Sequence, residues 1–356
     1  MKDKLNASPR YRLLRYLAAS YALFIIYVSL SPFSGWQDQG LSFSEVLTAP
    51  LEQTFTWFDS ILNFLSYMPL GFLLAYMLRN RARAIRVLLI ATLLCFSLSA
   101  AMEYIQMYLP TRVSSNADLL SNSLGAMCGV LLALAITPHS WFARIEDWHD
   151  KWFKRGRIND FGLTLIALWM FAQTNPSLPM LGSVFIREVA RWPFDIVPVP
   201  PFNWLECAVV ALNLLLLGIL LLMLLRERRH TLSALLLVLS AVTLIKFLAA
   251  AVLLKSWAIL LWLNSEAIFG IMAGLLLLAA TMRLPRIWLL ATGVLSAIAY
   301  LALVQGLLLV SPPSAAMRLY QWHYVHMLNY NGLSQLVNFL FPLLFTGFLW
   351  RIGRRS

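Results

Sequence analysis

The sequence has few charged side chains and very few of the residues that bind metals or form disulfides. Only 12% of its 356 residues are charged, and it contains five histidines and three cysteines. Soluble domains carry roughly a quarter charged residues, so this composition excludes an ordinary soluble protein. Cys95, Cys128 and Cys207 all fall within apolar runs, where cysteine packs as a small apolar side chain. We therefore expect neither disulfides nor a metal site.

Apolar residues are abundant instead. They make up 60% of the chain, and the mean hydropathy is +0.73. A membrane-spanning helix needs about 20 mostly apolar residues. The sequence therefore predicts an all-α, polytopic integral membrane protein with about ten transmembrane helices. The predicted helices cover residues 12–33, 57–78, 86–109, 118–137, 161–180, 204–225, 231–254, 257–281, 287–310 and 334–351.

The basic residues are distributed unevenly among the connecting loops. If the N-terminus is cytoplasmic, most of the 28 Lys and Arg residues fall in cytoplasmic segments, as the positive-inside rule requires. Both termini are then cytoplasmic, and a bacterial inner membrane is the expected location. The net charge of +12 reflects this orientation, so we expect no nucleic-acid partner. The outer loops hold only Arg112, Arg187, Arg191, Lys255 and Arg318, and Lys246 lies inside a predicted helix.

The helix pattern predicts three regions. Residues 1–137 form a four-helix membrane domain, and residues 161–356 form a second region of about six helices that can be read as a degenerate repeat. Residues 138–160 place tryptophans at helical spacing among basic residues, which favours an amphipathic helix on the inner surface. An ordinary connection with interfacial tryptophans is the alternative.

An unusual density of polar residues occurs in helices 57–78, 86–109 and 118–137. Ionisable groups inside a membrane are costly and call for a reason. Side chains three or four residues apart share one helix face, so each helix presents a polar pair near its outer end. Gly125 and Gly129 allow a neighbouring helix to approach closely. We predict one outer-leaflet ligand-binding pocket formed by Asp59, Asn63, Glu103, Gln106, Arg112, Asp118 and Asn122.

Several of these residues also have simpler explanations. Asp118 could cap its helix, because an anion is favourable at a helix N-terminus. Arg112 could be an interfacial anchor, and Asn63 and Asn122 could hydrogen-bond neighbouring helices. Glu103 must pair or protonate. A Glu103–Arg112 ion pair is the simplest structural explanation.

These spaced residues resemble the VanZ-type membrane domain. The resemblance rests on Asp59-x-x-x-Asn63, on Pro69-Leu-Gly71, on Glu103-x-x-Gln106-x-x-x-Pro110-x-Arg112, and on Asp118-x-x-x-Asn122-x-x-Gly125-x-x-x-Gly129. It covers about residues 12–137. The family takes its name from an accessory protein of glycopeptide-resistance clusters, associated with teicoplanin resistance. The resemblance implies a membrane domain linked to the cell envelope or to antibiotic resistance. Many members carry His where this chain has Asn63.

Three classes of function are compatible with these features. The first is a protein that binds an envelope amphiphile, such as a lipid-linked intermediate or a lipophilic antibiotic, with membrane lipids as partners and no cofactor. The second is an enzyme acting on lipid-linked phosphates, although no catalytic signature is recognisable. The third is a transporter, which would need matched polar sites in both halves. Outside the pocket, Lys246 and Glu266 lie at matched depth, which predicts a structural ion pair rather than a relay.

Overall fold

The computed structural model describes residues 9–50, 57–79, 82–136, 144, 147–148, 150–186, 202–310, 319–321 and 325–354. Contacts divide the chain into two compact units, residues 1–150 and 151–356. Most of the described residues are helical, and they contain no strand beyond isolated bridges, so the all-α prediction is confirmed.

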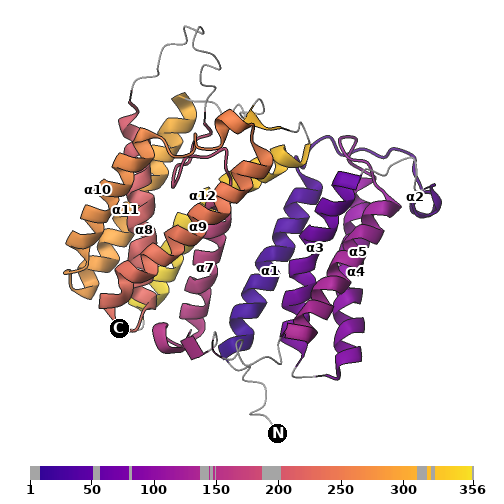
Figure 1. Cartoon of the computed structure of the whole chain (residues 1–356), viewed down its shortest axis with the longest axis horizontal. Helices are drawn as coiled ribbons and strands as arrows, with labels where there is room; N and C mark the ends of the chain where they lie inside the picture. The colour runs from indigo at the N-terminus through magenta and orange to yellow at the C-terminus, as the bar shows by residue number, and fades with distance from the viewer. Residues whose placement is uncertain are drawn as a thin grey trace. The chain divides into compact units, whose positions relative to one another are not determined.

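Over residues 9–136, the described part of the first unit forms four long helices and one short one (Figure 1). Helix α3 packs against α5 over most of its length, α4 packs against both, and α1 contacts α3 and α4. The short helix precedes α3 along the chain and is closed by a capping box between Ser42 and Glu45. The helices are α1 (Pro9–Leu30), α2 (Phe43–Thr48), α3 (Trp57–Leu78), α4 (Ala84–Gln106) and α5 (Asn116–Ile136).

Glycines bring the backbones of α3 and α5 into direct contact. A Cβ atom at Gly125 would overlap the carbonyl of Phe64, and one at Gly129 would overlap the carbonyl of Met68. In the opposite direction, a Cβ at Gly71 of α3 would overlap the carbonyl group of an α5 residue, Ala126. Only residues without a side chain permit this approach, as expected for small-residue packing in membranes. The predicted close contact at Gly125 and Gly129 is confirmed.

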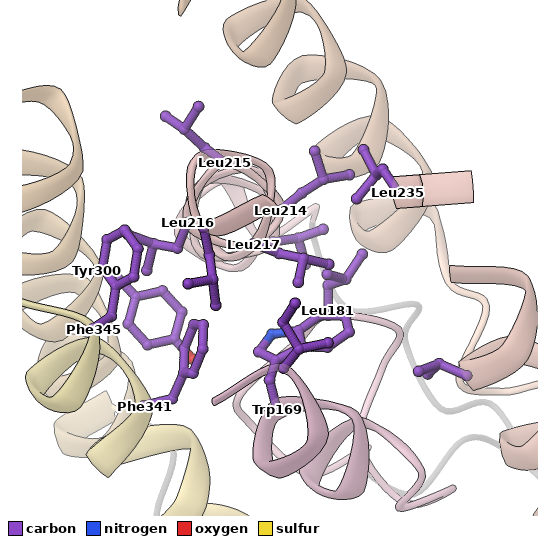
Figure 2. Close-up of a cluster of buried hydrophobic side chains, with 14 of the residues drawn as sticks. Trp169, Leu181, Leu214, Leu215, Leu216, Leu217, Leu235, Tyr300, Phe341 and Phe345 are labelled. Atoms are coloured by element: carbon purple, nitrogen blue, oxygen red, sulfur yellow. The ribbon is translucent and has the colours of Figure 1, made fainter. Parts of the chain in front are cut away.

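The second unit is built around α8, of which most residues are buried. Figure 2 shows leucines of α8 pointing to several sides: toward Tyr300, Phe341 and Phe345 on one side and toward Trp169 on another. Such all-round burial is typical of an apolar helix at the centre of a bundle. The elements are α7 (Arg157–Gln173), α8 (Trp204–Leu224), η3 (Arg228–His230), α9 (Thr231–Leu253), η4 (Ser256–Ala258), α10 (Ser265–Thr281), α11 (Arg286–Val310) and α12 (Val325–Gly353).

Within the described residues, eight helical segments are long and apolar enough to cross a membrane. Two of the ten predicted helices are shorter, with 17 residues each in α7 and α10. Helix α7 ends at Gln173, before the Asn175-Pro-Ser-Leu-Pro179 stretch, because proline removes a backbone donor and interrupts the helix. Helix α10 begins only after Asn264, whose side chain accepts from the N–H of Ala267. The count of ten spans and the orientation of the termini stay predictions.

The chain after α7 is irregular but buried. Met180 donates its N–H to Trp262 (2.8 Å), and Ile186 donates to Ser177 (2.9 Å). The carbonyl of Leu181 accepts from the side chain of Asn213 on α8. Of the predicted amphipathic linker at residues 138–160, the structure describes residues 144, 147–148 and 150–160, and the last four of these already belong to α7, which begins at Arg157.

Candidate functional site

Five of the seven predicted site residues lie near one end of the α3–α4–α5 bundle. We call this group the acidic cluster. Three of its members are half-buried, and Glu103 and Asn122 are buried behind them. The acidic cluster comprises Asp59 and Asn63 on α3, Glu103 on α4, and Asp118 and Asn122 on α5.

Asp118 is the member through which the three helices are connected. Its carboxylate is hydrogen-bonded by the Asn63 side chain and interacts electrostatically with Asp59, both from α3. It also interacts electrostatically with Glu103 of α4. Asp118 lies in the first turn of α5. It is not the cap of the helix, however, because Ser115 supplies the side-chain oxygen that accepts from the N–H of Ala117 (3.1 Å).

Glu103 ties the end of α4 to the start of α5. Its Oε2 accepts from the backbone N–H of Ser115 (2.8 Å) and from the hydroxyl of Ser114 (3.1 Å). The Ser114 hydroxyl also lies 2.7 Å from the Glu103 carbonyl oxygen. Hydrogen bonds from the N–H groups before a helix stabilise a carboxylate, so the position suits a buried acid. The expected Glu103–Arg112 ion pair is absent from these described contacts, and that interpretation was wrong.

Asn122 extends the acidic cluster toward the interior of the bundle. Its amide nitrogen donates to the Ser99 hydroxyl of α4 at 2.9 Å. Its Oδ1 is buried and has no hydrogen-bond partner among the described atoms. The Tyr67 hydroxyl lies beside Ser99 and Glu103, without a hydrogen bond of good geometry. An unfilled buried acceptor is costly, so this corner is suited to a donor from outside the protein.

Gln106 and Arg112 point instead to the end of α1. Gln106 donates to the Ser29 carbonyl at 2.9 Å. The Arg112 guanidinium donates to the carbonyls of Val28 (2.6 Å) and Ser31 (2.9 and 3.2 Å). A cation at a helix C-terminus satisfies the last carbonyls and complements the helix dipole. Burial lowers the pKa of Arg112. These hydrogen bonds give Gln106 and Arg112 a structural role at the C-terminal end of α1.

The segment between α1 and α3 is fastened to the same end of the bundle. Gln37 donates its N–H to the Tyr108 carbonyl (2.9 Å), and the Gln39 side chain donates to Met107 (2.8 Å). The Asn116 side chain, at the start of α5, donates to the carbonyl of Ala49 (2.7 Å). Trp36, in this segment, is exposed. This end of the unit therefore combines fixed polar loops with exposed apolar side chains, as expected at a membrane interface.

The second unit contains a buried cation that does not have the predicted partner. Lys246 of α9 is fully buried. Its Nζ donates to the carbonyls of Gln173 (3.1 Å) and Pro179 (3.3 Å), which the interruption of α7 leaves free. Glu266 instead accepts from the N–H of Asn203 (3.2 Å) and from Ser265. The predicted Lys246–Glu266 ion pair was therefore wrong, because the broken helix supplies neutral acceptors to the lysine.

A polar network of carboxamides and hydroxyls lies at the same break. The Oδ1 of Asn331 accepts from Asn175 (2.9 Å), Ser177 (3.1 Å) and Tyr320 (2.9 Å). Next to it, Gln173 donates to Asn338 at 3.1 Å. The amide nitrogens of Asn331, Gln335 and Asn338 are buried without described partners. The side-chain oxygen of Gln173 is also buried without a described partner, so this network leaves three nitrogens and one oxygen unpaired.

Sequence reasoning missed the partners that organise both polar regions. Ser99 precedes Glu103 by four residues, and Tyr67 follows Asn63 by four, so helical spacing alone could have indicated both. In α12, residues 331, 334, 335 and 338 are polar and share one helix face. That stripe was available in the sequence. The stripe contains no ionisable side chain, in contrast to the polar residues of α3, α4 and α5.

Among the described residues, no group of three or more His, Cys, Asp or Glu side chains is arranged to hold a metal ion. The acidic cluster has oxygen acceptors and carboxamides but no described geometry that would converge on one ion. Its chemistry is that of hydrogen-bond acceptance and of electrostatic attraction for cationic groups.

The eight described helical segments that are long and apolar enough to cross a membrane define a multi-pass helical membrane protein. Within it, residues 13–137 match the family model described as VanZ/LLP1. The VanZ-type resemblance inferred from the spaced polar residues is thereby confirmed over that segment. No curated protein and no solved structure matches the chain significantly.

Proposed function

We propose that the first unit binds the polar head of a cell-envelope amphiphile at the acidic cluster, in the outer leaflet of a bacterial inner membrane. The observation that carries this proposal is the position of Asp118, which joins residues of α3 and α4 while remaining half-buried. A half-buried carboxylate is open to a ligand from one side. The VanZ-type segment links the proposal to glycopeptide resistance of the teicoplanin type.

The head group that fits this cluster is rich in donors. Glu103 and Asp118 form no ion pair among the described residues, and Asn122 has an unfilled acceptor oxygen. Arg112, which would attract a phosphate, is held at the end of α1. The hydroxyl groups of a saccharide, or a protonated amino group, complement such acceptors. A lipid-linked saccharide or a glycopeptide antibiotic with a lipid tail belongs to this class.

The binding test compares two head groups on one lipid anchor and adds a glycopeptide antibiotic that has its own lipid tail. Purified protein in nanodiscs is titrated with undecaprenyl-pyrophosphate disaccharide, with undecaprenyl phosphate and with teicoplanin. We expect the disaccharide lipid or teicoplanin to bind, and Asp118→Asn to weaken that binding at least tenfold. Asp38→Asn is the control, because Asp38 is an exposed carboxylate outside the cluster. Equal affinity of bare undecaprenyl phosphate and the disaccharide lipid would contradict a donor-rich ligand.

The enzyme alternative is separated by the same preparation. Release of phosphate or sugar from the labelled disaccharide lipid, lost in Glu103→Gln, would replace binding with catalysis. Retained binding without turnover supports the proposal. In cells, Asp118→Asn should reduce any teicoplanin resistance conferred by the protein at unchanged membrane abundance, whereas parallel loss of abundance would indicate a structural role.

A further inference from the structure

A cavity of about 410 Å³ opens at one end of the second unit, far along the chain from the acidic cluster. Small-molecule sites have volumes of this order. Its lining includes five basic side chains, and no Asp or Glu contributes among the described residues. The basic residues are Lys154, Arg155, Arg226, Arg228 and Arg286.

Backbone contacts fix where these cations lie. An antiparallel bridge joins Phe153 to Leu225, with Lys154 N–H donating to Leu224 (2.9 Å) and Arg226 N–H donating to Trp152 (3.0 Å). This bridge holds the entry to α7 beside the exit from α8. Lys154 and Arg226 are therefore brought to the cavity from segments about 70 residues apart.

Three of the cationic side chains donate to backbone carbonyls of the second unit. Lys154 Nζ donates to the Met223 carbonyl (3.0 Å), and one nitrogen of Arg228 donates to Met282 (3.2 Å) and Leu284 (2.9 Å). Arg286 donates from one nitrogen to the carbonyl of Ile352 (3.2 Å). A guanidinium has five N–H donors, so each arginine keeps donors beyond these contacts. The arrangement is preorganised for an oxyanion.

The electrostatics of the cavity point the same way. Burial, and then the charges of Arg286 and Arg228, lower the pKa of Lys154. The first turn of α7 also lines the cavity through Gly156, Ile158 and Asn159. Its N-cap, Gly156, makes no side-chain cap hydrogen bond, although Asp160 contributes a carboxylate to the same turn. A helix N-terminus with free N–H groups attracts anions.

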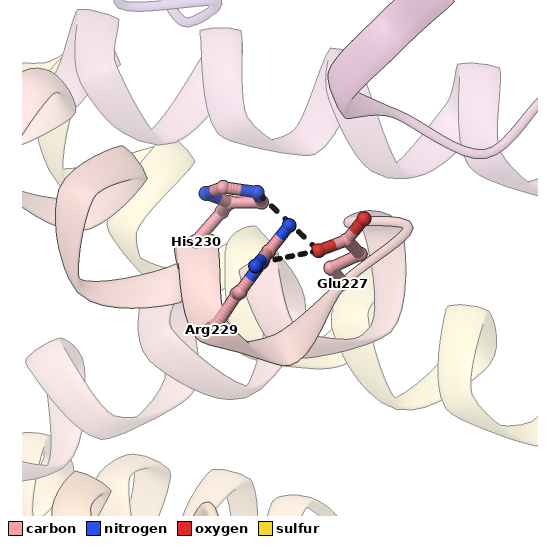
Figure 3. A network of polar contacts seen from close by, with 3 residues as sticks. All are labelled: Glu227, Arg229 and His230. Atoms are coloured by element: carbon pink, nitrogen blue, oxygen red, sulfur yellow. Dashed lines mark ion pairs between the residues drawn. The ribbon is translucent and has the colours of Figure 1, made fainter.

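A neighbouring arginine in the same loop has a carboxylate partner. Arg229 pairs with Glu227, which also lies 3.5 Å from the Nε2 of His230 (Figure 3). Arg229 does not line the cavity. The loop thus carries one arginine with a carboxylate partner and one, Arg228, that faces a cavity lined by further cations.

We propose that this cavity binds a phosphate group carrying two negative charges. Arg228 and Arg286 would hold its oxygens from one side, and the first turn of α7 would donate from the other. The basic loops that form the site are those the charge distribution predicts to be cytoplasmic. The phosphate would therefore come from an anionic lipid of the inner leaflet or from a soluble phosphate compound.

The test uses the full-length protein in an uncharged detergent and isothermal titration with three probes: dioctanoyl phosphatidate, dioctanoylglycerol and inorganic pyrophosphate. We expect saturable phosphatidate binding that weakens as salt rises, because exposed charges are screened. Arg228→Gln and Arg286→Gln should each weaken it at least tenfold, and Arg229→Gln should leave it unchanged. Binding of phosphatidate alone assigns the phosphate to a lipid, and comparable binding of pyrophosphate assigns it to a soluble compound.

Two results would overturn the proposal. One is equal binding of the neutral dioctanoylglycerol, and the other is wild-type affinity in both Arg228→Gln and Arg286→Gln. Arg228 also donates to carbonyls in the turn between α10 and α11, so replacing it can destabilise the protein and prevent it from accumulating. Lys154→Gln, which gives up a single backbone contact, then takes its place with the same expected loss.

Discussion

The backbone contact between α3 and α5 makes Gly125→Ala the sharpest test of the first unit. A Cβ at Gly125 would lie 2.7 Å from the carbonyl carbon and 2.8 Å from the Cα of Phe64. Non-bonded carbons are in contact at about 3.5–4.0 Å, so the helices must separate by about 1 Å. Backbone atoms cannot rotate away, and Gly129 and Gly71 extend the same contact along both helices.

We expect Gly125→Ala to cost about 1–3 kcal/mol, the usual range for overpacking a close contact. In a unit of this size that corresponds to a fall of roughly 2 to 12 °C in melting temperature. Cys95 offers a local reporter, because it is fully buried beside Tyr67, Leu70 and Ala126. In a Cys128→Ser, Cys207→Ser background, labelling of Cys95 by a thiol-reactive dye during heating follows unfolding of this unit alone.

Gly347→Ala provides the matched control, since a Cβ at Gly347 meets no described atom within 4 Å. It should leave Cys95 labelling unchanged and, if anything, stabilise α12 by up to ~1 kcal/mol through helix propensity. Overpacking at Gly125 is refuted if Cys95 in the Gly125→Ala variant becomes labelled at the same temperature as in the wild-type protein. It is also refuted if Gly125→Ala and Gly347→Ala shift the temperature of Cys95 labelling by the same amount.

Three further changes test other contacts. Arg112→Gln removes the guanidinium from the last carbonyls of α1 and should destabilise the first unit by about 1–3 kcal/mol, measured by the same labelling; no change would exclude a capping role. Asn331→Leu removes the acceptor that Asn175, Ser177 and Tyr320 share, and it should destabilise the second unit more than Tyr320→Phe, which removes one donor and costs about 1 kcal/mol. Thermal denaturation followed by size-exclusion chromatography ranks the two variants, and the reverse order would refute the network. Hydrogen bonds from Ser42 lower the pKa of Glu45, so the stabilisation of α2 by the Glu45 carboxylate is present above the ordinary carboxyl pKa and is lost as pH falls through the lowered pKa. Protection of residues 43–48 against hydrogen exchange should therefore decrease in that acidic range. Protection that does not depend on pH would argue against the capping box.

Apolar length predicted the helices well, because a bilayer imposes one simple requirement on every span. Predicted helix 57–78 matches α3 at both ends, and 204–225 exceeds α8 by one residue. The failures occur where proline and polar residues interrupt an apolar run. Helix α7 stops at Gln173 because Pro176 and Pro179 follow, and hydropathy alone reads through such an interruption.

The acidic cluster was predictable to the extent that spacing along a helix fixes a shared face. Asp59 with Asn63 and Asp118 with Asn122 were found in this way. The direction of Arg112 was not, because a long flexible side chain in a loop can reach several partners. From the sequence, the expected partner of Arg112 was the carboxylate of Glu103. In the folded chain the guanidinium donates instead to backbone carbonyls of α1. Backbone acceptors have no signature in a sequence, and Lys246 was misassigned for the same reason.

The two units use one packing device with different chemistry. In the second unit, a Cβ at Gly270 would lie 2.7 Å from the Cys207 carbonyl oxygen, and one at Gly274 would lie 2.9 Å from that of Ala211. Helices α8 and α10 thus approach through a Gly-x-x-x-Gly face, as α3 and α5 do, although their backbones are slightly further apart. The degenerate repeat stays a prediction, yet this parallel specifies what a duplication would have kept. It would have kept the small-residue contact, which any apolar neighbours can use, and lost the carboxylates, whose burial is costly without a ligand or partner. The polar groups of the second unit instead gather at the broken end of α7, where free carbonyls required donors, and so arise from a separate structural need.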